Sequence, residues 1–230
     1  MNRFVLLTAL CTAGVASAQV NVGPKTLTMG STKFRRIDAP KVALGYVVLK
    51  KGSKVDFERV TDACSTAIPK SAPHSINVTK AQESEFSGSY KGFSGSATVK
   101  AFREAKLQLA ELQLRERAWR SCVNSKPQLL KDLRNAEAAG NLRVVTYVWL
   151  VVTAEESNGL QSAISANVDL TIAGNGLSAS VASAANRTVT VSAPAGATYA
   201  YELSSVRWSG GKKDERTVEG LDLDKVDALY

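Results

Sequence analysis

The feature that most constrains the fold is a run of β-branched and aromatic residues at positions 143–153, RVVTYVWLVVT. Its apolar part, 144–152, is about half as long as the ~18 apolar residues that a transmembrane helix needs, and the composition of the run is typical of a central strand. Alternating apolar and polar residues follow it at 164–172, 177–181 and 189–193. Short strands at this spacing predict an antiparallel meander.

The chain before this run mixes strand and helix patterns. Residues 42–49, VALGYVVL, form a continuous apolar run that predicts a buried strand. Residues 53–68 carry apolar side chains at helical spacing, which predicts an amphipathic helix with Cys64 on its inner face. Residues 75–101 are rich in Ser and Gly with spaced hydrophobes, which indicates a thin amphipathic β-ribbon.

Residues 106–117 leave the choice between strand and helix open, because their leucines alternate and yet also line one helix face. A helical pattern then begins near Trp119, is interrupted at Pro127 and continues to Gly140. We therefore expect an α+β protein, a twisted antiparallel sheet with two or three packed helices.

The first 18 residues have the three parts of a secretory signal peptide. They carry a positive charge at Arg3, an apolar stretch at 4–10 and the small residues ASA at 16–18. Cleavage after Ala18 would leave residues 19–230 as a single α+β domain, long enough to bury a sizeable core. The mature protein is expected to be secreted or periplasmic.

Three cysteines are present. A lipoprotein anchor at Cys11 is disfavoured, because Leu10 is bulky where that signal needs a small residue. Once the signal peptide is removed, Cys64 and Cys122 remain, and an even pair in an exported chain predicts a disulfide. Two buried free thiols are the alternative.

The mature chain carries a surplus of positive charge. The whole chain has 29 Lys and Arg residues, one of them in the signal peptide, against 21 Asp and Glu. The cations cluster, for example at Lys50, Lys51 and Lys54 and again at Lys131 and Arg134. Such clusters favour anionic partners, and an exported protein meets lipid head groups or envelope polymers rather than nucleic acid. A solvated basic surface without a partner is the alternative.

Several segments occur in an order found in one known family. They are ALGYVVLKK at 43–51, LLKDLR at 129–134, NLRVVTYV at 141–148, RTVTVS at 187–192, PAG at 194–196 and TYAYELSSV at 198–206. Together they resemble the N-terminal, pore-forming domain of gasdermins. The matching parts of that family are an early strand with a basic hairpin loop, a Leu-rich basic helix, the strand after it, and two strands joined by a Pro/Gly turn. The resemblance spans about residues 31–208.

The resemblance implies a non-enzymatic protein that binds anionic membranes and oligomerises into a pore. Two hairpin regions of that family rearrange into membrane-spanning strands, which need about 9–11 alternating residues each. The hairpin candidates here are Ile164, Val168, Leu170, Ile172, Leu177 and Val181. The implied lipid contacts are Lys50, Lys51 and Lys54 in the hairpin loop, and Lys131 and Arg134 on the helix.

The chain departs from the family in three respects. Gasdermins are made in the cytosol, whereas a signal peptide is expected here. Residues 19–30 show no counterpart of the family's basic first helix, and no autoinhibitory domain is expected after residue 208. A monomeric envelope-binding or structural module, built on such a sheet without membrane insertion, is therefore the alternative function.

Patterns of catalytic and metal-binding residues are weak. The one histidine, His74, lies in a predicted loop without a companion nucleophile or metal ligand. Ser209 and Lys212 satisfy Ser-x-x-Lys, but they lie in a predicted turn rather than at the start of a helix. No catalytic residue, metal site or cofactor is expected.

Overall fold

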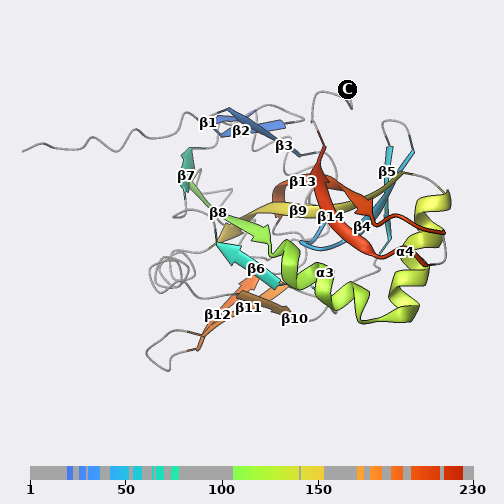
Figure 1. The fold of residues 1–230 in the computed structure, drawn as a ribbon. Coiled ribbons are helices and arrows are strands. Elements are labelled where there is room, and N and C mark those ends of the chain that lie inside the picture. The colour runs from blue at the N-terminus through green and yellow to red at the C-terminus, as the bar shows by residue number, and fades with distance from the viewer. Residues whose placement is uncertain are drawn as a thin grey trace, which may run out of the picture.

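The computed structural model describes residues 20–22, 26–29, 31–36, 42–51, 54–58, 64, 66–69, 74–77, 106–139, 141–152, 170–173, 177–182, 188–193, 198–212 and 215–224. Within these residues the chain is an α+β protein, with fourteen strands in one antiparallel sheet and two helices (Figure 1). The expected fold class is confirmed at this level.

Two long strands form the centre of the sheet. They are β9 (Asn141–Val152) and β13 (Thr198–Trp208), which pair antiparallel with Val148 opposite Tyr201 and Val144 opposite Ser204. The register shifts between Glu202 and Leu203, which marks a β-bulge. The prediction of a central strand is confirmed for residues 143–152, and Thr153 lies outside the described residues. Side chains of β9 are buried on both faces, as its continuous β-branched and aromatic composition predicts.

Shorter strands flank this central pair. Beyond β9 lie β8 (Lys106–Leu114) and β4 (Val47–Lys51), and beyond β13 lie β14 (Val218–Leu223) and β3 (Thr32–Arg35). The others are β1 (Val20–Val22), β2 (Thr26–Met29), β5 (Lys54–Glu58), β6 (Thr66–Pro69), β7 (His74–Asn77), β10 (Leu170–Ala173), β11 (Leu177–Ala182) and β12 (Thr188–Ala193). Strand β10 pairs with β6 and begins the meander β10–β11–β12.

Two helices pack on one face of the central strands. They are α3 (Glu116–Asn124) and α4 (Pro127–Ala139), and Pro127 occupies the first helical position, where a missing N–H costs nothing. Trp119, Val123 and Leu133 are fully buried and share one core cluster with residues of β4, β8, β9, β13 and β14. Each such side chain contributes about 2 kcal/mol to folding through its apolar area.

Helix α3 also seals β14, which lies at an edge of the described sheet. Three side chains at helical spacing, Glu116, Arg120 and Asn124, reach its backbone. Asn124 Nδ2 donates to the Val218 carbonyl at 2.9 Å, and Asn124 Oδ1 accepts from the Val218 N–H at 2.9 Å. Arg120 donates to the Glu219 carbonyl at 2.6 Å, and Glu116 accepts from the Leu221 N–H at 3.2 Å. These side chains take the place of a neighbouring strand and protect the edge from pairing with another chain.

The hairpin of β2 and β3 joins the sheet through β3, whose Arg35 is opposite Tyr201 of β13. Leu27 and Phe34 are opposite each other in this hairpin, and both are buried. The ring of Phe34 meets Trp149 of β9 edge-on, with centroids 5.5 Å apart. The guanidinium of Arg36 lies 4.7 Å from the ring centre of Tyr199, a cation–π distance.

The prediction of a helix at 53–68 is wrong. Lys54–Glu58 is β5, which pairs with β4, and Thr66–Pro69 is β6, which pairs with β8. The spacing of Phe57, Val60 and Cys64 fits a helix, but Val55 and Phe57 also fit strand alternation. Pairing of β5 with its neighbour β4, and of β6 with the distant β8, decides the outcome. Cys64 lies in a bend between β5 and β6, so it does not lie on a helix.

Three other expectations are settled in part. Residues 106–117 are a strand as far as Leu114, and a helix begins at Glu116. His74, expected in a loop, begins β7. Of the run 42–49, only the second half is strand, because Gly45 has a left-handed φ of 79° and turns the chain into β4. The predicted ribbon at 75–101 lies outside the described residues beyond Asn77.

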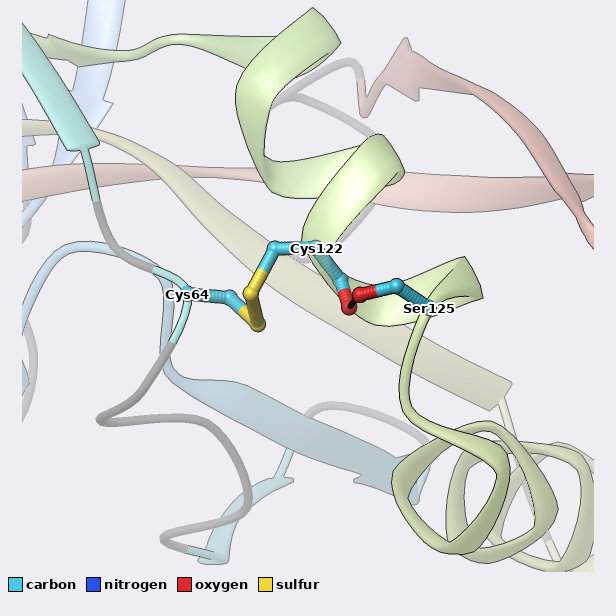
Figure 2. Close-up of a disulfide and its surroundings, with 3 residues drawn as sticks. All are labelled: Cys64, Cys122 and Ser125. Carbon is cyan, nitrogen blue, oxygen red and sulfur yellow. Dashed lines mark hydrogen bonds between the residues drawn. A yellow bond between two sulfur atoms is a disulfide. The ribbon is translucent and has the colours of Figure 1, made fainter.

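The disulfide expected between Cys64 and Cys122 is present in the structure (Figure 2), with Cα atoms 5.6 Å apart. It joins the bend after β5 to helix α3. The Ser125 hydroxyl donates to the Cys122 carbonyl at 2.8 Å, which stabilises the end of the same helix. The bridge therefore ties helix α3 to the segment just before β6.

Candidate anion-binding site

The sheet brings the two predicted cationic segments to one end of the molecule. Lys50 of β4 is opposite Asn141 in the register, and Asn141 begins β9 two residues after α4 ends. Lys51 is opposite Lys54, so both lie where β4 turns into β5. The β4–β5 hairpin and α4 lie on the same side of the molecule in Figure 1. The backbone therefore places three lysines of the hairpin near the exit of the basic helix.

Helix α4 presents Lys131 to solvent. Leu130 and Leu133 face the core, while Lys131 is exposed and has no ion-pair partner among the described residues. Its neighbour Asp132 instead accepts a hydrogen bond from Gln128 at 2.8 Å, an i, i+4 pair on the solvent face. Lys131 therefore lies where an anionic surface could reach it.

Arg134 has a different environment from Lys131. It is half-buried, and its Nε donates to the carbonyl of Arg216 at 2.7 Å, while its Nη2 donates to the same oxygen. Arg216 lies in the connection between β13 and β14. The guanidinium thus fixes this connection against α4, a contact between residues 82 positions apart that helical spacing alone does not indicate.

A small pocket lies beside this contact. It has a volume of about 70 Å³ and is lined by Arg134, Glu137, Ala138, Trp208 and Arg216. The indole Nε1 of Trp208 is buried and has no hydrogen-bond partner in the described part of the chain. Three N–H-bearing side chains therefore border one hollow, and one of the N–H donors is unsatisfied.

One carboxylate borders the same pocket. Burial raises the pKa of Glu137, while a hydrogen bond from the backbone of Leu142 and the charges of Arg143 and Arg216 counteract the increase. The guanidinium of Arg143 is itself paired, because its Nε lies 2.7 Å from Oδ2 of Asp224. The pocket itself has two guanidinium groups against one carboxylate whose negative charge is disfavoured.

A second group of charged residues lies in the sheet. Glu202 of β13 is 7% exposed and stands opposite Tyr147 of β9, and Glu111 of β8 stands opposite Trp149 in the next row. Burial raises the pKa of Glu202 to about 7, the charge of Glu111 adds to the increase, and Arg35 counteracts it. Burial also raises the pKa of Tyr147, and the charges of Glu202 and Glu111 add to the increase. Glu202 therefore changes charge near neutral pH.

The membrane-hairpin candidates fall only in part on described residues. Leu170 and Ile172 lie on β10, Leu177 and Val181 lie on β11, and the register places Leu170 opposite Val181. Ile164 and Val168 lie outside the described residues. The four described candidates share one face of the meander, because opposite residues and residues two apart point to the same side of a sheet.

Comparisons of the chain with known protein families, with curated proteins and with solved structures gave no match. No helix among the described residues is both long and apolar enough to span a membrane. In the described ranges, no group of three His, Cys, Asp or Glu residues has the arrangement of a metal site.

Proposed function

We propose that this protein is an exported, non-enzymatic protein that binds anionic membrane surfaces through its cationic end. The observation that carries the proposal is the position of the β4–β5 hairpin beside the exit of α4. It brings the backbone of Lys50, Lys51 and Lys54 near the end of α4, the helix that carries Lys131. Each cation near an anionic bilayer contributes about 1 kcal/mol, so four support a weak, salt-sensitive attachment.

We further propose, following the resemblance to gasdermins, that the meander β10–β11–β12 enters the bilayer and that several subunits associate there to form a pore. None of its sixteen described residues is charged. Its register sorts them by type. One face carries the aliphatic residues Leu170, Ile172, Leu177, Ala179, Val181, Val189, Val191 and Ala193, and the other carries the small and polar residues Thr171, Ala173, Ser178, Ser180, Ala182, Thr188, Thr190 and Ser192. A strand pair crossing lipid needs this separation.

Vesicle experiments test both steps. Sedimentation with vesicles that contain phosphatidylserine measures attachment, and release of an enclosed dye measures insertion. We expect attachment to these vesicles, little attachment to vesicles of phosphatidylcholine alone, and loss of attachment at high salt. Equal attachment to both vesicle types, or none to either, would remove the membrane proposal.

A matched pair of variants locates the contact. Lys131→Glu on α4 and Arg117→Glu on α3 change the net charge equally, and both residues are exposed. We expect the Lys131→Glu variant to attach at least tenfold more weakly and the Arg117→Glu variant to stay within about twofold of the unmodified protein, since the proposed contact lies on the α4 side. Equal weakening of both would indicate general charge attraction rather than a defined surface.

The second candidate is a monomeric module that binds an anionic envelope polymer without insertion. It is favoured by the two connections that hold the helices in place, the Cys64–Cys122 bridge and the side chains of α3 on β14. A protein of this kind would attach to anionic vesicles or polymers without releasing dye. It would also stay monomeric in detergent, where the first proposal expects larger assemblies.

A further inference from the structure

Five strands lie at edges of the described sheet, because each of them pairs with a single described strand. They are β1, β5, β7, β12 and β14. An edge strand presents unpaired N–H and C=O groups to other chains, and proteins usually keep such strands short, charge them or cover them. Four of these five edges have a protection of this kind, and β12 has none.

The protection of the other four edges takes three forms. Strands β1 and β7 are short, with three and four residues. Strand β5 carries the charged residues Lys54, Asp56 and Glu58. The backbone of β14 is hydrogen-bonded by side chains of α3. Strand β12 (Thr188–Ala193) has six residues, and none of them is charged or a proline. Within the described sheet, β12 is therefore the edge most open to pairing with another strand.

The register of the meander puts Thr190 of β12 at the end of a row of hydroxyl residues. Thr171 of β10 is opposite Ser180 of β11, and Ser180 is opposite Thr190. The next row belongs to the other face and is aliphatic, with Ile172, Ala179 and Val191. Both rows end at the open edge of β12, so a further strand continues them if its own residues alternate in the same way.

A second copy of β12 has this alternation. Opposite residues lie on the same face of a sheet, so two antiparallel copies keep their faces matched when a two-fold axis passes through Thr190 or through Val191. The first arrangement puts Thr190 opposite Thr190 and Val189 opposite Val191. The second puts Val191 opposite Val191 and Thr190 opposite Ser192. Threonine opposite threonine or serine is a favourable cross-strand pair, and valine fits the pleated surface.

We propose that two copies of this protein associate through β12, which joins their meanders into one continuous antiparallel sheet. The contact is isologous, since the same six residues face each other in both copies, and it closes after two copies. The joined meanders keep one aliphatic and one polar face. Dimer formation needs no lipid, so it is independent of the proposed membrane binding, and assembly into a pore would need a second contact between dimers.

Sedimentation equilibrium without lipid, between about 1 and 100 µM protein, measures the association. A contact through one strand edge is small, so we expect a weak dimer whose fraction rises with concentration. Thr190→Lys charges the open edge and, in the first arrangement, places two like charges opposite each other, so it should weaken dimerisation at least tenfold. Thr171→Lys is the matched control, because Thr171 lies in the same row but between β6 and β11. It should dimerise within about twofold of the unmodified protein.

Single cysteine substitutions locate the two-fold axis. A short bismaleimide joins two free thiols that lie close together in neighbouring copies. We expect Thr190→Cys or Val191→Cys to give a covalent dimer on denaturing electrophoresis, at a level well above that of the unmodified protein. Thr171→Cys is again the control and should not crosslink, since its strand has a neighbour of its own chain on both sides.

The proposal is overturned if the unmodified protein is monomeric at every concentration, or if Thr190→Lys and Thr171→Lys weaken the association equally. It is also overturned if neither Thr190→Cys nor Val191→Cys crosslinks more than Thr171→Cys. Lys131→Glu keeps the result separate from the membrane proposal, because it should weaken vesicle attachment and leave dimerisation unchanged. Dimer formation without vesicle attachment would reject the membrane proposal and retain this one, and attachment by a protein that stays monomeric would do the reverse.

Discussion

Arg207 of β13 lies directly opposite Gly220 of β14, and its guanidinium passes over the glycine. Its Nη1 is 2.6 Å from Oδ1 of Asp222, and its Nε is 3.6 Å from Oε2 of Glu219. A Cβ at position 220 would lie 2.4 Å from Nη2 of Arg207 and 3.1 Å from Oε1 of Glu116. Because Gly220 has no side chain, the guanidinium of Arg207 can lie over this position and contact both carboxylates.

Substitution of Gly220 by alanine is therefore expected to displace Arg207. The side chains of Arg207 and Asp222 are about half exposed, so the loss is modest, about 1 kcal/mol in the free energy of unfolding. Urea unfolding of Gly220→Ala measures it. In an Arg207→Ala background the same substitution should cost much less, because no guanidinium remains to clash. An equal cost in both backgrounds would place the strain in the backbone or at Glu116 instead.

Asn124 offers a sharper test of the sealed edge. Its amide satisfies both the N–H and the carbonyl of Val218, as a neighbouring strand would. Asn124→Ala removes two hydrogen bonds and leaves these groups to water, at a cost of about 2 kcal/mol. It also opens part of an edge, so we expect a concentration-dependent increase in size by gel filtration. Ser121→Ala, on the exposed side of the same helix, is the control and should change neither property.

The fold could be predicted where local composition decides it. The β-branched and aromatic composition of 143–153 predicts a central strand. The alternation of apolar and polar residues within 170–193 predicts the strands of the meander. The predicted helix at 53–68 failed because Phe57 satisfies both a helical and a strand period, and because Thr66–Pro69 pairs with the distant strand β8. No local pattern contains that partner, since strand pairing depends on which segments meet in three dimensions.

Some features of the candidate site could likewise be predicted from local sequence, whereas others depend on contacts between distant segments. Exposure of Lys131 follows from the amphipathic period of α4, which places Leu130 and Leu133 on the core side. The contact of Arg134 with Arg216 and the presence of Trp208 in the pocket depend on where the β13–β14 connection meets α4. Glu202 alternates with Tyr201 and Leu203, so its pattern suggests a solvent face. The structure nevertheless buries it.

Glu202 predicts how stability depends on pH. Its pKa is raised from 4.5 to about 7 in the folded protein, so the folded state holds a proton more tightly than the unfolded state between these values. Stability is therefore greatest at the acid end of this window, falls as the pH rises from about 4.5 to about 7, and is constant above it. Allowing for solvent screening, the contribution of this group is about 2 kcal/mol.

Glu202→Gln should flatten this dependence and raise stability above neutral pH, because the amide carries no buried charge. Urea unfolding at about pH 5 and about pH 8 measures both effects. The free energy of unfolding should still fall slightly as the pH rises, since the pKa of Glu137 is also raised. Glu215→Gln, at an exposed position, is the control and should retain the full slope. A variant Glu202→Gln with an unchanged slope would show that another group is responsible.

The Cys64–Cys122 bridge closes a loop of 58 residues that includes the strands β6, β7 and β8. A crosslink over this length is expected to stabilise the folded state by about 3–4 kcal/mol, mainly by restricting the unfolded chain. Urea unfolding with and without a reducing agent should show this difference, and the double variant Cys64→Ser with Cys122→Ser should show no response to the reductant. Mass measurement of the protein expressed with residues 1–18 in place decides whether the bond forms. If the denatured protein has two reactive thiols and the unfolding midpoint is the same in both conditions, the cysteines are free. Packing and the contacts with β14 would then be what holds α3 to the sheet.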